Sequence, residues 1–455
     1  MRIIIVGCGK VGRTIAEQLN GEKHDITIID TYESVIARLT EKLDVMGIEG
    51  DGSSMEILRE AGTQNADLLI AVTDADELNL YICLVANSMG AKNTIARVRK
   101  PVYHKDLNDR MSKVRNSLGL SLMINPEMIA ATEIHRLIRF PSAIEVDTFA
   151  GGRVELYTFK LQKDNPLIGK RIKDTSLLKG NVRICCIERD DEVIIPDGDF
   201  MPTLGDKVSV ICTPENAVKL FKKTNNSNSK VKDIMIIGGS RTAYYLARLL
   251  ESNHLNVKII EKDEKRCEEL SDMLSDTTII KGDGMNKDLL KTEQFDQMDC
   301  VVTLTNIDEE NIMLSLYARQ MTGAKCITKI DRLVFDSIVE TLPLDSVIKP
   351  RELTAEAIVR YVRAVNNSRG SNVETLYKLN DGKAEALEFK VATDDDDFIS
   401  KPLKDIRFIT NMNVVCITRR GKIIIPKGDD MIEKGDSVII VTTHKGLQDL
   451  SDILA

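Results

Sequence analysis

The chain repeats itself, and this duplication constrains its fold more than any other feature. Residues 2–12, RIIIVGCGKVG, are echoed by residues 232–243, KDIMIIGGSRTA, and each segment is an apolar run that enters a Gly-rich turn. Asp30 ends the run ITIID, and Glu261 ends the run VKIIE 231 positions later. Self-similarity along a chain indicates a structural unit that is built more than once, so we expect two copies of one architecture.

The duplication extends well beyond these turns. The tripeptide GDG at residues 50–52 returns at 282–284, and residues 196–210 match residues 426–440. Between the halves, residues 222–232 (KKTNNSNSKVK) have the polar composition of a linker. At about 150 residues per domain, a chain of 455 residues needs several domains. We therefore expect two halves of similar fold.

Each half contains two successive patterns. The first, seen in residues 3–98, alternates short β-branched runs with helical stripes, which is typical of βαβ units around a parallel sheet. The second is rich in strand and turn signals. The predicted fold class is α/β, with two Rossmann-like, doubly wound parallel sheets, each followed by a small α+β lobe. The predicted segments are a first Rossmann-like domain at 1–140, a first C-terminal lobe at 141–222, a linker at 223–232, a second Rossmann-like domain at 233–366 and a second C-terminal lobe at 367–455.

Composition excludes several classes of protein. Lys and Arg number 62 against 70 Asp and Glu, a net charge of −8 with no basic stretch, which argues against a nucleic-acid partner. The nine cysteines show no CxxC spacing and indicate reduced thiols in the cytoplasm. The longest apolar runs fall far short of the roughly 18 residues of a membrane span, so we expect neither a transmembrane segment nor a signal peptide.

The neighbouring cysteines Cys185 and Cys186 lie in the strand-like run VRICCI. Because side chains alternate along a strand, we expect these two to point to opposite faces of a sheet. Their expected role is packing.

The first Gly-rich turn carries the clearest chemical signal. Residues 7–12 fit G-x-G-x-x-G after a strand and before a helix, and Asp30 follows Gly12 by 18 residues. Gly7 permits the tight turn, Gly9 lets backbone N–H groups approach a pyrophosphate, and Gly12 lets helix pack on strand. Asp30 would accept the ribose hydroxyls of an adenosine and repel a 2′-phosphate, which favours NAD(H) over NADP(H).

The second half carries an altered copy of this turn. Ser240 stands in place of Gly9, and its Cβ should crowd a pyrophosphate at the point of closest approach. Ala243 replaces Gly12, and Glu261 keeps the carboxylate on a longer side chain. We expect a second nucleotide-shaped site with weaker or different occupancy, and an empty structural copy is the alternative. Its candidate residues are Gly238, Gly239, Ser240, Arg241, Thr242 and Glu261.

These motifs together resemble a known family. A tandem of Rossmann-like and small C-terminal lobes bearing GCGKVG, TIID, GDGS, AVTDADELN and IARVR is similar to the TrkA proteins of the Trk potassium-uptake system, which consist of two RCK units. The resemblance covers essentially the whole chain. It implies a regulatory subunit, peripheral at the inner face of the cell membrane, that forms a homo-oligomer such as a tetramer or ring. The implied ligands are NAD(H) and also ATP or ADP, and the implied partner is a TrkH-type membrane channel subunit.

The resemblance also implies particular site residues in the first half. Lys10 stands where single-RCK relatives often carry Arg, and Lys loses the bidentate fork, so a strong ATP preference is not expected. Glu127 matches a family carboxylate near the nucleotide of a neighbouring subunit, whereas Arg351 stands at the corresponding place in the second half. The implied nucleotide-site residues are Gly7, Cys8, Gly9, Lys10, Val11, Gly12, Asp30, Thr73, Asp74 and Arg97.

An NAD-dependent oxidoreductase is the alternative function. Such an enzyme normally needs a sizeable second domain that places an acid or base near the nicotinamide. Each Rossmann-like unit is followed by only about 80 residues, and no proton donor is obvious there. The five histidines show no paired spacing of a metal site. We therefore expect a binding protein without catalytic residues or a metal.

Overall fold

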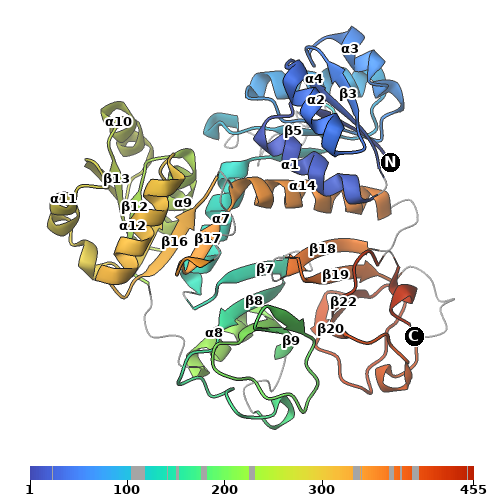
Figure 1. Ribbon diagram of the computed structural model, residues 1–455, viewed down its shortest axis with the longest axis vertical. Helices are drawn as coiled ribbons and strands as arrows, with labels where there is room; N and C mark the ends of the chain where they lie inside the picture. The colour runs from blue at the N-terminus through green and yellow to red at the C-terminus, as the bar shows by residue number, and fades with distance from the viewer. Residues whose placement is uncertain are drawn as a thin grey trace. The chain divides into compact units, whose positions relative to one another are not determined.

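The fold is described from a computed structural model (Figure 1). The described residues are 1–22, 24–103, 118–140, 142–149, 153–175, 182–224, 231–331, 339, 341–367, 373–379, 382–391, 399–447 and 449–454.

The first half begins with a six-stranded parallel sheet. Its strand order is β3-β2-β1-β4-β5-β6, so the order reverses between β1 and β4. The strands are β1 (Arg2–Val6), β2 (Asp25–Asp30), β3 (Met46–Glu49), β4 (Leu68–Ala71), β5 (Thr94–Arg97) and β6 (Leu122–Ile124). The helices are α1 (Lys10–Leu19), α2 (Glu33–Lys42), α3 (Met55–Glu60), α4 (Asp76–Met89) and α7 (Pro126–Arg139), with short 3-10 turns η1 (Asn20–Glu22) and η2 (Thr63–Asn65).

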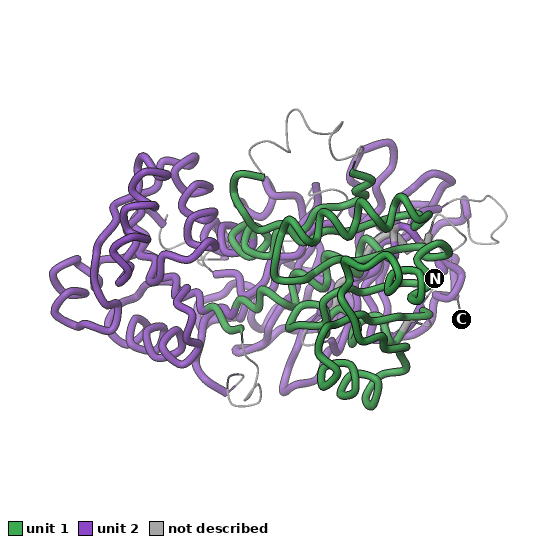
Figure 2. The backbone as a smooth tube through the Cα atoms, turned by 90° about the horizontal axis from the view of Figure 1, so that it is seen from above, with its two compact units in different colours: residues 1–132, 329–334, 348–362 green, residues 133–328, 335–347, 363–455 purple. Residues whose placement is uncertain are grey.

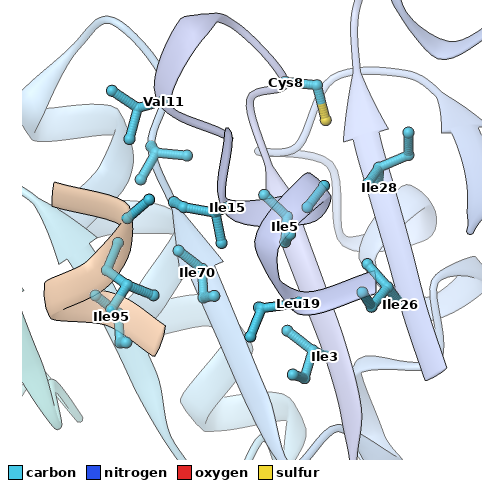
Figure 3. Close-up of a cluster of buried hydrophobic side chains, with 14 of the residues drawn as sticks. Ile3, Ile5, Cys8, Val11, Ile15, Leu19, Ile26, Ile28, Ile70 and Ile95 are labelled. Atoms are coloured by element: carbon cyan, nitrogen blue, oxygen red, sulfur yellow. The ribbon is translucent and has the colours of Figure 1, made fainter. Parts of the chain in front are cut away.

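Apolar residues on both faces of β1 explain why this strand is central. Ile3 and Ile5 belong to one buried cluster and Ile4 and Val6 to another, so helices must cover both faces of the sheet. On the first face, residues 11, 15 and 19 of α1 recur every fourth position and are buried. Figure 3 shows these side chains directed toward the strand residues of the same cluster.

The second half repeats this sheet with the order β14-β13-β12-β15-β16-β17. The strands are β12 (Asp233–Ile237), β13 (Asn256–Glu261), β14 (Thr277–Lys281), β15 (Cys300–Thr303), β16 (Lys325–Lys329) and β17 (Ser346–Ile348). The helices are α9 (Arg241–Glu251), α10 (Glu264–Met273), α11 (Lys287–Thr292), α12 (Asp308–Met321) and α14 (Pro350–Asn367), with the 3-10 turn η6 (Phe295–Gln297). Both Rossmann-like sheets thus have the predicted class and the same strand order.

Each sheet is followed by a small lobe with a five-stranded antiparallel sheet, and the two orders, β10-β9-β11-β8-β7 and β18-β19-β22-β20-β21, run through equivalent strands. The first lobe contains β7 (Glu145–Phe149), β8 (Val154–Lys160), η4 (Ile172–Asp174), β9 (Val182–Arg189), β10 (Glu192–Ile194), β11 (Lys207–Cys212) and α8 (Pro214–Lys223). The second contains β18 (Val373–Leu379), β19 (Ala384–Lys390), η7 (Leu403–Asp405), β20 (Met412–Arg419), β21 (Lys422–Ile424), β22 (Ser437–Thr442) and η8 (Leu450–Ile453).

The two small lobes share one hydrophobic core. Leu156 and Ile211 of the first lobe are buried in one cluster with Ala386 and Ile439 of the second. Lobes of this size bury little apolar surface alone, and their pairing compensates for that.

The prediction that Cys185 and Cys186 point to opposite faces is wrong. Both are buried in the core that the small lobes share. The pairing of β9 with β11 skips one residue, because Ser209 lies opposite Cys186 and Val210 opposite Ile184. Such a β-bulge breaks the alternation of side chains. The equivalent strand β20 shows the same irregularity next to Cys416.

The chain forms two compact units, one of residues 1–132, 329–334 and 348–362 and the other of residues 133–328, 335–347 and 363–455 (Figure 2). In the first unit, the N-terminal part of α14 packs on the first sheet, since Ile358 and Val362 lie in the same buried cluster as Ile3 and Ile5. A helix that follows the second sheet in sequence therefore completes the core of the first.

Among the described residues, no helix is both long and apolar enough to span a membrane.

Candidate functional site

The candidate site of the first half lies where its parallel strands end. The turn between β1 and α1 sits beside the reversal of strand order between β1 and β4. Ligands of open α/β sheets bind at the carboxyl ends of the strands at such a switch point.

Two glycines shape this turn. Gly7 has a φ of +90°, and a Cβ there would lie 2.8 Å from the backbone nitrogen of Thr73. A Cβ on Gly12 would lie 2.0 Å from the carbonyl oxygen of Gly7. By contrast, a Cβ on Gly9 would meet nothing within 4 Å. Gly7 and Gly12 therefore pack the turn closely against its neighbours, whereas Gly9 leaves open space in front of it.

Helix α1 begins without a side-chain cap. Gly9 is its N-cap residue and has no side chain to accept a hydrogen bond from the first turn. Its N-terminal N–H groups are thus left for another acceptor, and the positive end of the helix dipole lies at the same place. An anionic group such as a pyrophosphate fits this arrangement.

Asp30 is fixed above the turn by two backbone hydrogen bonds. The Cys8 N–H donates to Asp30 Oδ2 at 2.7 Å, and the Tyr32 N–H donates to Oδ1 at 3.0 Å. Each carboxylate oxygen can accept a further hydrogen bond. The carboxylate is therefore preorganised next to the glycine turn, as an acceptor for ribose hydroxyls requires.

The loop after β4 joins this site through Arg97. Its Nη2 donates to the Thr73 carbonyl oxygen at 2.5 Å and contacts Asp74 Oδ1 at 3.1 Å. The Arg97 side chain is 9% exposed, and burial lowers the pKa of its guanidinium. Within the described residues, its Nε has no hydrogen-bond partner. The structure thus brings Thr73, Asp74 and Arg97 together next to Gly7.

Asn79 holds this loop in place. Its Oδ1 accepts hydrogen bonds from the Thr73 N–H at 2.8 Å and the Thr73 hydroxyl at 2.7 Å, while its Nδ2 donates to the Arg97 carbonyl oxygen at 2.9 Å. Sequence reasoning did not identify Asn79 as a site residue. The repeat contained the signal, because Asn311 holds the equivalent place in the second half. There the Thr305 N–H donates to Asn311 Oδ1 at 2.9 Å.

Glu127 lies in the same unit as the first turn and pairs with Arg99. Arg99 Nε donates to Glu127 Oε1 at 2.6 Å, whereas Glu127 Oε2 is buried without a partner among the described residues. At the corresponding places the second half carries Asp331 and Arg351. Both charges are therefore exchanged between the halves.

The other predicted residues of the first turn differ in role. The Val11 side chain is buried in the core between α1 and the sheet, so only its backbone faces the turn. Lys10 has an exposed side chain. Cys8 is buried; burial, and then the Asp30 charge, raises the pKa of its thiol to about 12. Cys8 therefore contributes its backbone N–H, not a reactive thiolate.

The second half forms a cavity of about 340 Å³ at the equivalent place. The cavity is bounded by the glycine turn after β12, by the end of β13, and by the loops that follow β14 and β15. Of the predicted residues, Gly238, Gly239, Ser240 and Glu261 line it. Arg241 and Thr242 are absent from the described lining, and Thr242 is buried.

This turn differs from the first in its hydrogen bonds. The Gly239 N–H donates to Glu261 Oε2 at 2.6 Å, which reproduces the contact between Cys8 and Asp30. Ser240, however, caps helix α9 with its own side chain, because its Oγ accepts from the Ala243 N–H at 3.3 Å. In addition, Arg266 Nε donates to the Gly239 carbonyl oxygen at 2.7 Å.

Arg266 was not predicted, and repetition could not have revealed it. Val35 holds its place in the first half. The same applies to Met285 and Ile307, which line the second cavity where the first half has Ser53 and Ala75. Within the described residues, no cluster of three or more His, Cys, Asp or Glu side chains is placed to hold a metal ion.

Comparison with known families matches both kinds of lobe twice. The TrkA-N domain family matches residues 3–125 and 234–350, and the TrkA-C domain family matches residues 156–225 and 387–455.

Similar curated proteins cover nearly the whole chain. "Trk system potassium uptake protein TrkA homolog 1" of Methanosarcina mazei is 34% identical over 452 residues, which is 97% of this chain and 97% of that protein. "Trk system potassium uptake protein TrkA" of Halomonas elongata is 32% identical, covering 98% of this chain and 96% of the relative.

Solved structures share the fold at low identity. "GsuK channel bound to NAD" matches with a TM-score of 0.63 at 16% identity, over 98% of this chain and 77% of that chain. "Crystal Structure of the GsuK RCK domain" matches with a TM-score of 0.62 at 16% identity, over 98% and 92% of the respective chains.

Proposed function

The chain belongs to the TrkA family of Trk system potassium uptake proteins, and from this premise we propose that it is a nucleotide-sensing regulatory subunit that gates a TrkH-type membrane channel. The relatives named for potassium uptake cover 97% and 98% of it. We place the subunit in the cytoplasm, at the inner face of the membrane through its partner, as a homo-oligomeric ring of RCK units.

One observation carries the proposal: the uncapped glycine turn of the first half, with the Asp30 carboxylate fixed above it. The free N–H groups of α1 suit a pyrophosphate, and Asp30 suits a ribose with two free hydroxyls. NAD(H) presents both groups, so NAD(H) is the proposed ligand. Solved structures with this fold include a GsuK channel bound to NAD and GsuK bound to ADP, which supports testing adenine nucleotides as well.

Ligand binding would act on conformation. Asn79 connects the loop after β4 to β5. A ligand that contacts Thr73 or Arg97 can therefore change the positions of the ends of both strands. The core beneath them includes α14. If the nucleotide favours one arrangement of the lobes by about 1.4 kcal/mol, the ratio of open to closed assemblies changes tenfold.

The alternative, an NAD-dependent oxidoreductase, has less support. Hydride transfer needs an acid or base that exchanges protons near neutral pH. Burial raises the pKa of the Cys8 thiol to about 12, and Arg97 stays protonated. The relatives are also named as uptake proteins and not as enzymes.

Potassium flux tests the proposal. A TrkH-type channel is reconstituted in vesicles with and without this chain while NAD⁺, NADH, ATP and ADP are varied. We expect flux to depend on nucleotide only when the chain is present, and Asp30→Ala to remove the response to NAD(H). Flux that ignores nucleotide, or steady NADH oxidation with a small carbonyl substrate and no membrane protein, would contradict the proposal.

A further inference from the structure

The cavity of the second half is the best-formed feature that the first site does not explain. Its volume of about 340 Å³ lies near the lower end of the roughly 300–1,000 Å³ of small-molecule sites. It retains the ribose-type acceptor Glu261, held by the Gly239 and Asp263 N–H groups at 2.6 and 2.8 Å. A base and a ribose therefore fit its size and its best-ordered polar group better than a dinucleotide does.

The turn of this cavity is less suited to a pyrophosphate than the first turn is. The Ser240 hydroxyl accepts the Ala243 N–H and so occupies one of the donors that α9 would offer to an anion. In the first half, a Cβ at the equivalent Gly9 would project into open space in front of the turn. Ser240 places both a Cβ and a hydroxyl at that position. The two changes oppose a phosphate chain at the same point.

The charged side chains around the cavity also limit the number of phosphate groups that its ligand can carry. Asp263 and Glu310 stand where the first half has Tyr32 and Leu78. Arg266 is already engaged, through Nε with Gly239 and through Nη1 with Glu269 at 2.7 Å. Each further phosphate would bring negative charge into a lining rich in carboxylates. Among the described lining residues, the charged ones are Glu261, Lys262, Asp263, Arg266, Asp283 and Glu310.

Apolar side chains complete the lining. Met285 and Ile307 are 45% and 43% exposed, although both belong to the cavity. Exposed large apolar side chains in a concave site favour a flat, uncharged partner, and a methionine sulfur packs well on aromatic rings. A nucleobase has these properties.

We infer that the second cavity binds a ribonucleoside that carries at most one phosphate, with adenosine and AMP as the probes. Glu261 accepts the ribose hydroxyls, and Met285 and Ile307 pack against the base. Lys262 and the remaining capacity of Arg266 accommodate one phosphate. The inference rests on the proposed nucleotide-sensing function and adds that the two halves bind different ligands.

Equilibrium dialysis of the full-length Asp30→Ala variant with adenosine, AMP, ADP, ATP and NAD⁺ tests this inference, because that variant removes the acceptor of the first site. We expect adenosine and AMP to bind, and affinity to fall about tenfold from AMP to ADP and again to ATP. Glu261→Ala should weaken adenosine binding by about tenfold or more. If Asp30→Ala melts early, the more conservative Asp30→Asn, which removes the charge of the first-site carboxylate, replaces it as the background.

A matched variant sharpens the result. Ser240→Gly combined with Glu310→Leu gives the second cavity the residues that the first half has at these two positions, and we expect it to shift preference toward ADP. Affinity that rises with phosphate number in the unchanged cavity, or no binding of adenosine and AMP to a folded variant, would overturn the inference. NADH-dependent potassium flux is measured separately, so its loss would contradict the proposed function even if adenosine binds.

Discussion

The two glycine turns of the chain occupy equivalent places and differ in what they offer a ligand. Both follow the central strand of a sheet with the same strand order, and both hold a carboxylate against a backbone N–H. The first leaves its helix uncapped behind Gly9, whereas the second caps its helix with Ser240. The duplication has therefore kept the carboxylate beside the turn and changed how the following helix is capped.

The comparison also shows how a single methyl group decides turn geometry. Gly12 has no room for a Cβ, since one would lie 2.0 Å from the Gly7 carbonyl oxygen. Ala243 carries a Cβ at the corresponding position and is fully buried. The second turn must therefore run differently in detail. Sequence similarity at this level does not guarantee an equivalent anion site.

The largest effect is expected from Gly12→Ala. The clash with backbone must displace the first turn, and hydrogen bonds to charged groups contribute about 1.5–3 kcal/mol each. Loss of two such bonds weakens NAD(H) binding at the first site by at least about 100-fold, as measured by calorimetry. Ala243→Gly is the matched control, and we expect it to leave first-site affinity unchanged. Equal losses in both variants would break the comparison.

Asp30→Ala is expected to have the next largest effect. A carboxylate that accepts ribose hydroxyls contributes on the order of 1–3 kcal/mol to binding. Calorimetric affinity for NAD(H) should fall accordingly while the fold persists, with Glu261→Ala as the control in the other half. If affinity at the first site stays the same once the second is silenced, Asp30 is not the ribose acceptor.

Gly9→Ser should separate stability from binding. Since a Cβ at this position meets no neighbour, the protein should fold, and a serine N-cap should raise the melting temperature slightly. The hydroxyl would occupy one helix N–H, so NAD(H) affinity should fall about tenfold. A gain in affinity, measured beside the melting curve, would contradict the role assigned to Ser240 in the second turn.

The smallest effect concerns the exchanged charges. Glu127→Gln leaves the half-buried Arg99 without its carboxylate and should lower the free energy of unfolding by about 1 kcal/mol, because the pair is partly exposed. The double variant Arg99→Asp with Glu127→Arg copies the second half and should recover most of that loss in denaturant unfolding. No recovery would show that the surroundings of the pair, and not the pair alone, set the order of the charges.

Local signals in the sequence predicted the frame of the molecule well. The duplication, both sheet classes and the placement of Asp30 and Glu261 beside their turns followed from strand runs and spacing. What escaped prediction depends on contacts between distant residues. The buried cluster that contains both Ile3 and Ile358 joins residues far apart in the chain, and the bulge at Cys185 depends on how two strands pair.

Within the site, a motif taken residue by residue does not predict which side chains line the cavity. Thr242 belongs to the motif yet points into the core, because a helix turns consecutive side chains in different directions. Arg266 lies outside any nucleotide motif yet contacts the turn through α10. A motif fixes the path of the backbone, and the side chains that line the site also come from elements that the motif does not include.

The most direct test of the central claim is an experimental structure of the full chain with NADH at saturating concentration. We expect NADH in the first half, with its pyrophosphate at the uncapped end of α1 and its ribose on Asp30, and no dinucleotide in the cavity beside Ser240. NADH at full occupancy and in the same pose in both halves would contradict the claim that the two sites have diverged.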